Sequence, residues 1–308
     1  MDSILFIVVI QILSFFLFEI IEKSLNMASV IDSAVFAELT GVSQVHIDQK
    51  SNILEGCCKM CGVCCADSSN VYDVVLPKGI RYQVKEHSGS CARCWCNPNH
   101  ELMLGLKTFD GKKHGDKDIL NILKPFKCCC PAICSCCMKE IAITHNDRPV
   151  GFVQQPQCGG CFTPRLNMYD KANGAQIGIV TGPGCCMGGC CASEFAVNDM
   201  QNKPLATIKR LGIGDNGVRR ALTTDADRYQ VDFTNQDEAL NTKLTVLSTT
   251  LMLDYMFFEG ETNCSFNCCV CPPYIACKLC DMYCCGATLP CKIRCFVPVE
   301  EAAKAAVL

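Results

Sequence analysis

Repeated strand–turn–strand patterns between residues 75 and 235 constrain the fold of this chain more than any other feature. Short half-apolar runs alternate there with residues that accept a positive φ, and four such units follow one another. They are ELMLGLKTFDGKKHGDKDILNIL, MKEIAITHNDRPVGFVQQ, PRLNMYDKANGAQIGIV and SEFAVNDMQNKPLATIKR, with Asp110-Gly111, Asn146-Asp147, Asn173-Gly174 and Asn198-Asp199 at their bends. Such units are typical of β-hairpins. Four or more successive hairpins predict an antiparallel meander, which closes most easily into a barrel.

The same meander predicts where the cysteines gather. Connections in an up-and-down meander alternate between its two ends, so the tight turns take one end and the longer connections the other. The longer connections hold most of the clustered cysteines of this region, namely Cys128 to Cys137, Cys158, Cys161, Cys185, Cys186, Cys190 and Cys191, while Cys91, Cys94 and Cys96 precede the first hairpin. The sequence therefore predicts a barrel with one cysteine-rich pole.

Thirty cysteines in 308 residues call for a chemical explanation. Adjacent cysteines such as Cys57-Cys58 rarely pair with each other because their side chains diverge. This disfavours a disulfide framework and favours a reducing, cytosolic compartment for most of the chain. One interpretation is S-acylation, which would hold the domain on a cytoplasmic leaflet. The cysteines expected to be acylated are Cys128, Cys129, Cys130, Cys134, Cys136 and Cys137.

Two other interpretations of the cysteines stay open. Pairs with C-x-x-C spacing are typical of zinc ligands, although the cysteines are too numerous for one site and no paired histidines accompany them. The pairs that would bind zinc, or else be acylated, are Cys91 with Cys94, Cys158 with Cys161, and Cys277 with Cys280. The remaining interpretation is that many cysteines are small buried apolar side chains.

An acidic run, TDADRYQVDF, suggests a calcium site but fits poorly. The candidate ligands are Asp225, Asp227, Asp232 and Asp237. Counted from Asp225 as an EF-hand loop, only the first two liganding positions fit, and position 6, which should be glycine, is Gln230. The alternation of Tyr229, Val231 and Phe233 with polar residues predicts instead a strand with one buried face. Calcium bound by these carboxylates is therefore the weaker of two interpretations.

The segment LTVLSTTLMLDYMFF, residues 244–258, predicts an apolar helix, which we place within residues 238–259. Its apolar length of about 22 Å, at 1.5 Å per residue, falls short of a hydrocarbon core of roughly 30 Å. Asp254 lies within it, and a carboxylate at bilayer depth is costly. A helix that is apolar on nearly all sides also suits the axis of a closed barrel. We therefore expect a central helix rather than a membrane span.

Three regions follow from these patterns. Residues 1–43 form an apolar N-terminal segment, residues 44–260 the barrel with its helix, and residues 261–308 a cysteine-rich tail to which the patterns assign no fold. The apolar run Ile4 to Ile21 is interrupted by Gln11 and Glu19 and has no basic residue before it. It is compatible with a membrane anchor, an ordinary apolar helix, or leader sequence upstream of Met27.

Net charge and the motifs present argue against two classes of protein, nucleic-acid-binding proteins and enzymes. A net charge of -3 gives no electrostatic reason to expect nucleic acid as a partner. No Ser-His-Asp set, phosphate loop or pair of catalytic carboxylates emerges, so we do not expect an enzyme.

The order of several motifs resembles the phospholipid scramblase family from about residue 73 to residue 260. The matching segments are CCCPAICSCCMKEIAI, PVGFVQQ, GPGCCMGGCC, LTTDADRYQVDF and LMLDYMFFEG. The resemblance implies a barrel of twelve antiparallel strands around a central helix, as in tubby-like proteins. It also implies calcium-stimulated, ATP-independent movement of phospholipids between leaflets, and palmitoylation of Cys128 to Cys137. By the same resemblance, residues 225–236 would be the calcium segment.

Several features depart from that family. The N-terminal segment is apolar rather than proline-rich, Gln236 stands where an aspartate often ends the calcium segment, and the cysteine-rich tail extends beyond the family's usual end. Two functions therefore stay open: a lipid scramblase, or an acyl-anchored module that binds lipid headgroups or proteins without moving lipid. Either would make a phospholipid membrane the main partner, on the cytoplasmic face and, by the resemblance, at the plasma membrane.

Overall fold

The computed structural model describes most of the barrel and part of the tail. The described residues are 35–50, 69–89, 101–109, 112–113, 115–127, 137–170, 174–184, 186–187, 193–211, 227–258, 264–267 and 274–296. Cys91, Cys94, Cys128 to Cys136 and Asp225 lie outside them.

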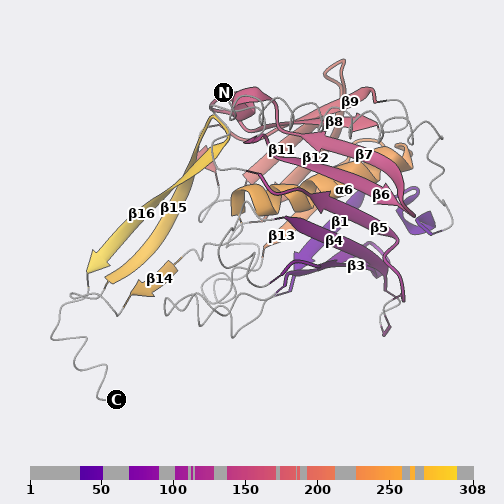
Figure 1. Ribbon diagram of the computed structural model, residues 1–308, viewed down its shortest axis with the longest axis horizontal. Coiled ribbons are helices and arrows are strands. Elements are labelled where there is room, and N and C mark those ends of the chain that lie inside the picture. The colour runs from indigo at the N-terminus through magenta and orange to yellow at the C-terminus, as the bar shows by residue number, and fades with distance from the viewer. Residues whose placement is uncertain are drawn as a thin grey trace, which may run out of the picture.

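Twelve strands form a closed antiparallel barrel (Figure 1). Around the barrel the order is β1-β13-β12-β11-β9-β8-β7-β6-β5-β4-β3-β2, and β1 closes it by pairing with both β2 and β13. The strands are β1 (Gln44–Gln49), β2 (Val71–Leu76), β3 (Gly79–Glu86), β4 (Leu102–Thr108), β5 (Leu120–Lys124), β6 (Glu140–His145), β7 (Arg148–Gln154), β8 (Arg165–Asp170), β9 (Gln176–Thr181), β11 (Ser193–Asn198), β12 (Pro204–Arg210) and β13 (Arg228–Phe233). The predicted closed barrel is confirmed.

The four predicted hairpins are also confirmed. They are β4–β5, β6–β7, β8–β9 and β11–β12, each with an antiparallel register. Asn146 and Asp147 both have positive φ, at 48° and 61°, as a two-residue hairpin turn with the twist of its strands requires. Gly174 and Asn202 have positive φ in the turns of the next two hairpins. Turn chemistry thus set the strand boundaries locally.

The predicted central helix runs through the barrel (Figure 1). Helix α6 (Leu240–Leu253) continues into a π-helical turn, η4 (Asp254–Phe258), and every residue from Thr242 to Phe258 is buried. Thr245, Thr249 and Thr250 donate their hydroxyls to helix carbonyls four residues earlier, at 2.7 to 3.0 Å. These bonds let polar side chains lie inside the core. Among the described residues, no helix combines the length and the apolarity that a bilayer crossing needs.

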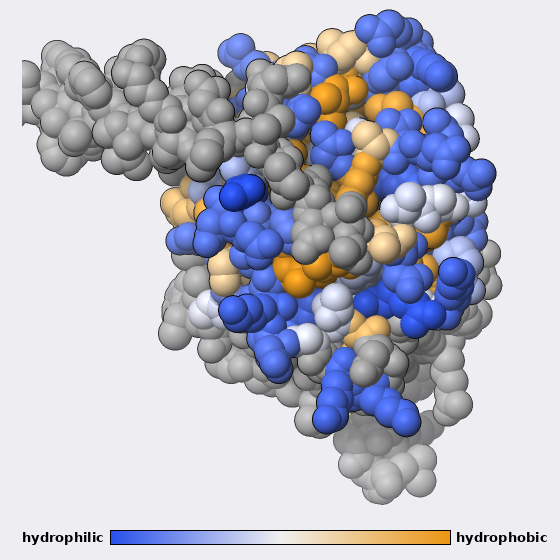
Figure 2. Space-filling model, turned by 90° about the vertical axis from the view of Figure 1, so that its right-hand side faces the viewer, coloured by the Kyte–Doolittle hydropathy of each residue, from blue (hydrophilic) through white to orange (hydrophobic). Residues whose placement is uncertain are grey.

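The two ends of the barrel differ, and we name them by what they carry. The turn pole holds the tight hairpin turns and the 3₁₀ helix η1 (Ala37–Leu39). Leu39 of this helix and Phe36, which precedes it, are part of the core. There Lys243 anchors the start of α6 by donating to the carbonyls of Leu39, Val42 and Gln236 at 2.6 to 3.1 Å. Figure 2 faces this pole and shows a mostly hydrophilic surface with hydrophobic residues near its centre.

The cysteine pole lies at the other end. Its longer connections include the 3₁₀ turn η3 (Gln157–Gly160) between β7 and β8. A four-stranded sheet of the tail lies across this pole, with β10 (Cys186–Met187) and β14 (Cys264–Asn267) along one edge of β15 (Tyr274–Cys284), and β16 (Ala287–Phe296) along the other. Tyr283 joins this sheet to the barrel, because its hydroxyl donates to the Gly159 carbonyl at 2.7 Å and its ring lies 5.6 Å from that of Phe257. The tail therefore has a fold that sequence patterns did not assign.

Candidate functional site

The predicted acylation run spans the connection from β5 to β6, at the cysteine pole. Of its six candidate cysteines the structure describes Cys137, which is buried. The others lie outside the described residues, so their acylation stays a prediction. Two lysines flank the run, Lys124 at the end of β5 and Lys139 just before β6. Burial lowers the pKa of each of these lysines to about 8.

Cys158 and Cys161 lie in the connection between β7 and β8, also at the cysteine pole. Both have positive φ, at 56° and 63°, and Cys161 is exposed. The Cys161 carbonyl accepts a hydrogen bond from the backbone N–H of Cys285 at 2.7 Å, which joins this loop to the tip of the β15–β16 hairpin. The described cysteines of the predicted pole thus lie where the meander places them.

The structure surrounds Cys280 with thiols from neighbouring strands. Cys291 is its cross-strand partner on β16, and Cys186 lies on β10. Burial, followed by the hydrogen-bonded thiol of Cys291, raises the pKa of Cys280 to about 11, which leaves it protonated near neutral pH. In the described part of the chain, no group of three or more His, Cys, Asp or Glu side chains is placed to hold a metal ion. Zinc at the predicted pairs stays a prediction, because Cys91 and Cys94 lie outside that part.

The acidic run forms the predicted strand, β13, with Tyr229, Val231 and Phe233 buried. Its three described aspartates, Asp227, Asp232 and Asp237, do not come together. Asp227 points into the barrel, where its carboxylate lies 2.7 Å from the Arg210 guanidinium. Asp232 lies on the other face of β13 and accepts a hydrogen bond from Gln44 Nε2 at 2.7 Å. Asp237 is exposed in the turn before α6.

The most distinctive polar feature of the cysteine pole is a buried network around Asp254. The hydroxyls of Tyr72 and Tyr229 each donate to the Asp254 carboxylate at 2.6 Å, and Tyr229 also lies 3.4 Å from Asp227. Burial, followed by the charge of Asp227, raises the pKa of Asp254 to about 7. Burial, followed by Asp254, raises the pKa of Tyr229 well above its ordinary value. The carboxyl group is thus held where it exchanges a proton near neutral pH.

A second branch of this network ties η4 to the first strands. The Tyr255 hydroxyl donates to Glu86 at 3.0 Å and accepts from Asn70 Nδ2 at 3.1 Å. Gln49 donates to Asn70 at 3.0 Å and accepts from the Asp227 backbone N–H at 2.9 Å. Together the two branches connect the end of the helix to β1, β2, β3, β12 and β13. The arrangement supplies hydrogen-bond partners to most of the buried polar groups at this end of the barrel.

Sequence reasoning missed this network. Asp254 was noticed only as an obstacle to a membrane span, and Tyr229 only as part of a buried face. Its two tyrosine donors come from strands 182 and 25 residues away from Asp254. A carboxylate inside a fully apolar helix was the available signal, because such a group must find buried partners.

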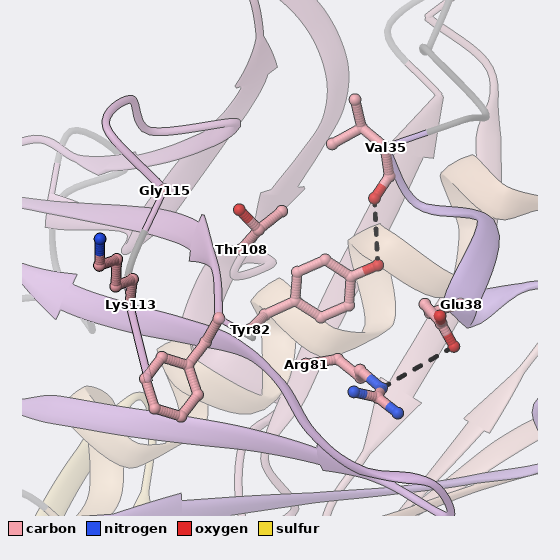
Figure 3. A pocket seen from close by; sticks show the side chains of 8 residues that line it. Val35, Glu38, Arg81, Tyr82, Thr108, Lys113 and Gly115 are labelled. Atoms are coloured by element: carbon pink, nitrogen blue, oxygen red, sulfur yellow. Dashed lines mark hydrogen bonds and ion pairs between the residues drawn. The ribbon is translucent and has the colours of Figure 1, made fainter. Parts of the chain in front are cut away.

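A pocket of about 370 Å³ lies at the turn pole, and its lining contains no predicted site residue (Figure 3). The Tyr82 hydroxyl donates to the Val35 carbonyl at 3.2 Å, and Arg81 Nε lies 3.9 Å from the Glu38 carboxylate. Burial, followed by the charge of Glu38, raises the pKa of Tyr82 to about 12. The lining residues are Val35, Glu38, Arg81, Tyr82, Thr108, Phe109, Lys113 and Gly115. Arg81 and Glu38 offset each other's charge, and Lys113 adds one further cation to the lining.

Comparison with known proteins identifies the family. The Scramblase family model matches residues 24–260, a stretch that contains all twelve barrel strands and the central helix. No solved structure matches the chain. Because the match covers more than half of the sequence and agrees with the predicted motifs, the chain belongs to the scramblase family.

Proposed function

We propose that this protein moves phospholipids between the leaflets of a membrane without ATP and is stimulated by calcium. The observation that carries the proposal is the family match over residues 24–260. The match contains the complete barrel and helix, so the whole folded unit is available for the family's activity. The protein is not expected to be an enzyme, since its proposed action makes and breaks no covalent bond.

The proposed partner is the cytoplasmic face of a phospholipid membrane, most specifically the plasma membrane. Acyl chains on Cys128, Cys129, Cys130, Cys134 and Cys136 would hold the cysteine pole there, whereas Cys137, the sixth cysteine of the prediction, is buried and would contribute least. More than one chain is needed for stable attachment. Lys124 and Lys139 lie on either side of this run in the sequence, and a cation close to a thiol favours the thiolate that attacks an acyl donor. The cluster of cysteines and the two flanking lysines both support acylation of the connection between β5 and β6.

A second function is favoured by the position of the helix. All residues from Thr242 to Phe258 are buried inside the barrel, which leaves the helix without a surface along which a headgroup could pass. A protein of this shape suits an acyl-anchored module that binds lipid headgroups or other proteins without moving lipid. The two functions share the same anchor and differ in whether lipid crosses the bilayer.

Reconstitution separates the two functions. Purified protein in liposomes with fluorescent lipid in both leaflets should allow dithionite to bleach most of the inner-leaflet label if the protein scrambles lipid. Calcium should speed the loss. Bleaching that stops at the outer leaflet, with protein bound to the liposomes, would reject scrambling and leave the module. Protein-free liposomes control for leakage of dithionite. An Asp225→Ala variant controls for the stimulation by calcium.

The proposed calcium site uses Asp225, Asp227, Asp232 and Asp237 and should be weak. Asp227 is already paired with Arg210, and Asp232 lies on the opposite face of the strand. A cation would therefore have to compete with a buried ion pair, so we expect a dissociation constant in the upper micromolar range or above, as for poorly liganded loops. Titration calorimetry that finds a tight site lost in Asp225→Ala would contradict this expectation.

Acylation is tested by replacing the six cysteines of the run with alanine. The protein should then move from the membrane to the cytosol in fractionated cells, provided that residues 1–26 are deleted as well. A matched variant with Cys280, Cys284 and Cys291 replaced should stay on the membrane. Unchanged membrane association of the six-cysteine deletion variant would reject the acyl anchor.

A further inference from the structure

Exposed apolar side chains gather toward one pole of this protein. Of the eight large apolar side chains exposed in the described part of the chain, Met200 alone lies in a turn of the turn pole. Met103 and Leu123 are cross-strand partners near the cysteine-pole ends of β4 and β5. The other five belong to the cysteine pole and the sheet across it: Phe126, Phe162, Met282, Leu289 and Ile293.

The β15–β16 hairpin carries three of these side chains on its outer face. Met282 and Leu289 are cross-strand partners, and Ile293 lies four residues beyond Leu289 on the same face of β16. The exposed fractions of Met282, Leu289 and Ile293 are 47%, 60% and 50%. The inner face is different, because Asp281 and Tyr283 are buried at 2% and 1%. Strand alternation therefore gives the hairpin one face against the barrel and one apolar face outside.

Other exposed apolar side chains lie on the connections of the same pole. The tip of the hairpin bonds to Cys161, and the next residue, Phe162, is 63% exposed. Phe126 is exposed just before the acylation run begins. We call the outer side chains Met282, Leu289 and Ile293, together with Phe162, the hairpin face. In Figure 1 the hairpin stands beyond the left-hand end of the barrel, with η1 at the opposite end.

Charge on the hairpin favours one kind of partner. Strand β16 carries no acidic residue, and its exposed Lys292 and Arg294 alternate with Leu289 and Ile293, so they lie on the other face of the strand. Long cationic side chains next to exposed apolar ones can reach lipid headgroups, as in segments that bind at the interface of an anionic bilayer. A lipid surface also agrees with the position of the predicted acyl anchor at the same pole. A protein partner would be the alternative, and the test below distinguishes it.

We propose that the hairpin face inserts into the interfacial region of a bilayer containing anionic lipid, and so orients the barrel with its cysteine pole toward the membrane. The described strands β14 to β16 lie beyond the family match, which ends at residue 260, so this contact lies outside the part of the chain that the family match covers. The inference rests on the proposed membrane association but is independent of lipid movement. The hairpin face is proposed to contact lipid rather than a protein.

A local fluorescence probe tests the insertion. The chain has a single tryptophan, Trp95, so a Trp95→Phe background leaves any new tryptophan as the only one. Leu289→Trp places a probe on the hairpin face, and Met200→Trp places a matched probe at a 48% exposed site of the turn pole. Full-length protein is mixed with phosphatidylcholine–phosphatidylserine vesicles whose acyl chains carry bromine. Quenching should be several-fold stronger at position 289 than at position 200.

Equal quenching at the two positions, or vesicles that bind no protein, would overturn the proposal. Binding of a soluble protein to the hairpin, with no quenching at position 289 on vesicles, would also reject it. Strong quenching at position 289 in protein that fails to scramble lipid would support the docking and reject scrambling. The two proposals can therefore fail separately.

Substitution gives an independent measurement. Leu289→Asp and Ile293→Asp should each weaken vesicle binding about tenfold, because a partly buried aliphatic side chain contributes about 1.4 kcal/mol and a carboxylate opposes anionic lipid. Met200→Asp should leave vesicle binding unchanged. Equal vesicle affinities for all three variants, with folding verified by circular dichroism, would contradict the insertion.

Discussion

The two poles of the barrel are built from different kinds of interaction. At the turn pole, residues adjacent in sequence define the structure, as in the bend at Asn146 and Asp147, where both residues have positive φ. At the cysteine pole, long connections are closed by contacts between distant residues, such as Tyr72 with Asp254 and Arg210 with Asp227. The difference shows that a barrel can have bends specified locally at one end, where Lys243 adds a long-range contact, and long connections specified by the core at the other. Substitutions at the cysteine pole should therefore have larger effects on stability.

The largest effect is expected in the helix, one turn before the network. Leu251→Asp would place an unpaired carboxylate inside the barrel, where Leu251 is buried. We expect a loss of more than about 5 kcal/mol of unfolding free energy, enough to unfold a domain of ordinary stability. Denaturant titration measures it, with Met200→Asp as the exposed control. A folded Leu251→Asp protein would mean that the helix is not core.

The ion pair of the cysteine pole comes next. Arg210→Met leaves the Asp227 carboxylate buried without its cation and should lower the unfolding free energy by roughly 3–5 kcal/mol. Lys209→Met is the matched control on the outer face, where Lys209 lies 3.7 Å from Asp232 and both side chains are partly exposed. That change should stay within about 1 kcal/mol. If the double variant Arg210→Met/Asp227→Leu recovers most of the lost stability, the unpaired charge is the cause. Equal losses in Arg210→Met and Lys209→Met would contradict this explanation.

The proton on Asp254 gives the cysteine pole a pH dependence. Its pKa in the folded protein is raised to about 7, so between the ordinary aspartate value and about 7 the folded state keeps a proton that the unfolded chain has lost. Stability contributed by this group should therefore fall as the pH rises through that window and level off above it. Asp254→Asn should lose less stability across the same window, measured by urea unfolding at several pH values. Parallel pH profiles for the two proteins would show that Asp254 does not hold this proton.

The smallest effect is expected at the turn pole. Asn146→Ala places a residue with a Cβ and no compensating amide at φ 48° and should cost about 1 kcal/mol. Asp147→Gly removes the strain at the neighbouring position and should be neutral or slightly stabilising. Thermal unfolding measures both. Equal destabilisation by the two substitutions would show that the turn's backbone conformation does not govern this pole.

These differences explain what could be predicted from the sequence. The hairpins were predictable because Asn, Asp and Gly mark positive φ at the bends and the strands alternate over short distances. The central helix was predictable because residues 244–258 are apolar around their circumference yet too short for a bilayer. Asp254 pointed the same way, and the structure gives it buried partners at 2.6 Å. Local rules were sufficient for these elements.

The rest depended on contacts that local rules do not describe. Nothing near Asp254 in the sequence identifies Tyr72 as its donor, since the two are 182 residues apart. The tail sheet was missed because β15 and β16 mix cysteines with apolar and basic residues, so their alternation emerges only when one face meets the barrel. The spacing of Asp225, Asp227 and Asp232 suggested one cation, whereas strand geometry sends Asp227 and Asp232 to opposite faces.

The central helix also affects how this protein is made. Strand β13 ends at Phe233 and α6 begins at Leu240, so a ribosome releases all twelve barrel strands before the helix around which they close. The first strand, β1, must also wait for the last, β13, before the barrel can close. The inward apolar faces therefore have no core to cover during most of translation, which exposes them to aggregation or to chaperones. A nascent chain that stops before residue 240 should be an unfolded substrate for degradation rather than a partly built barrel.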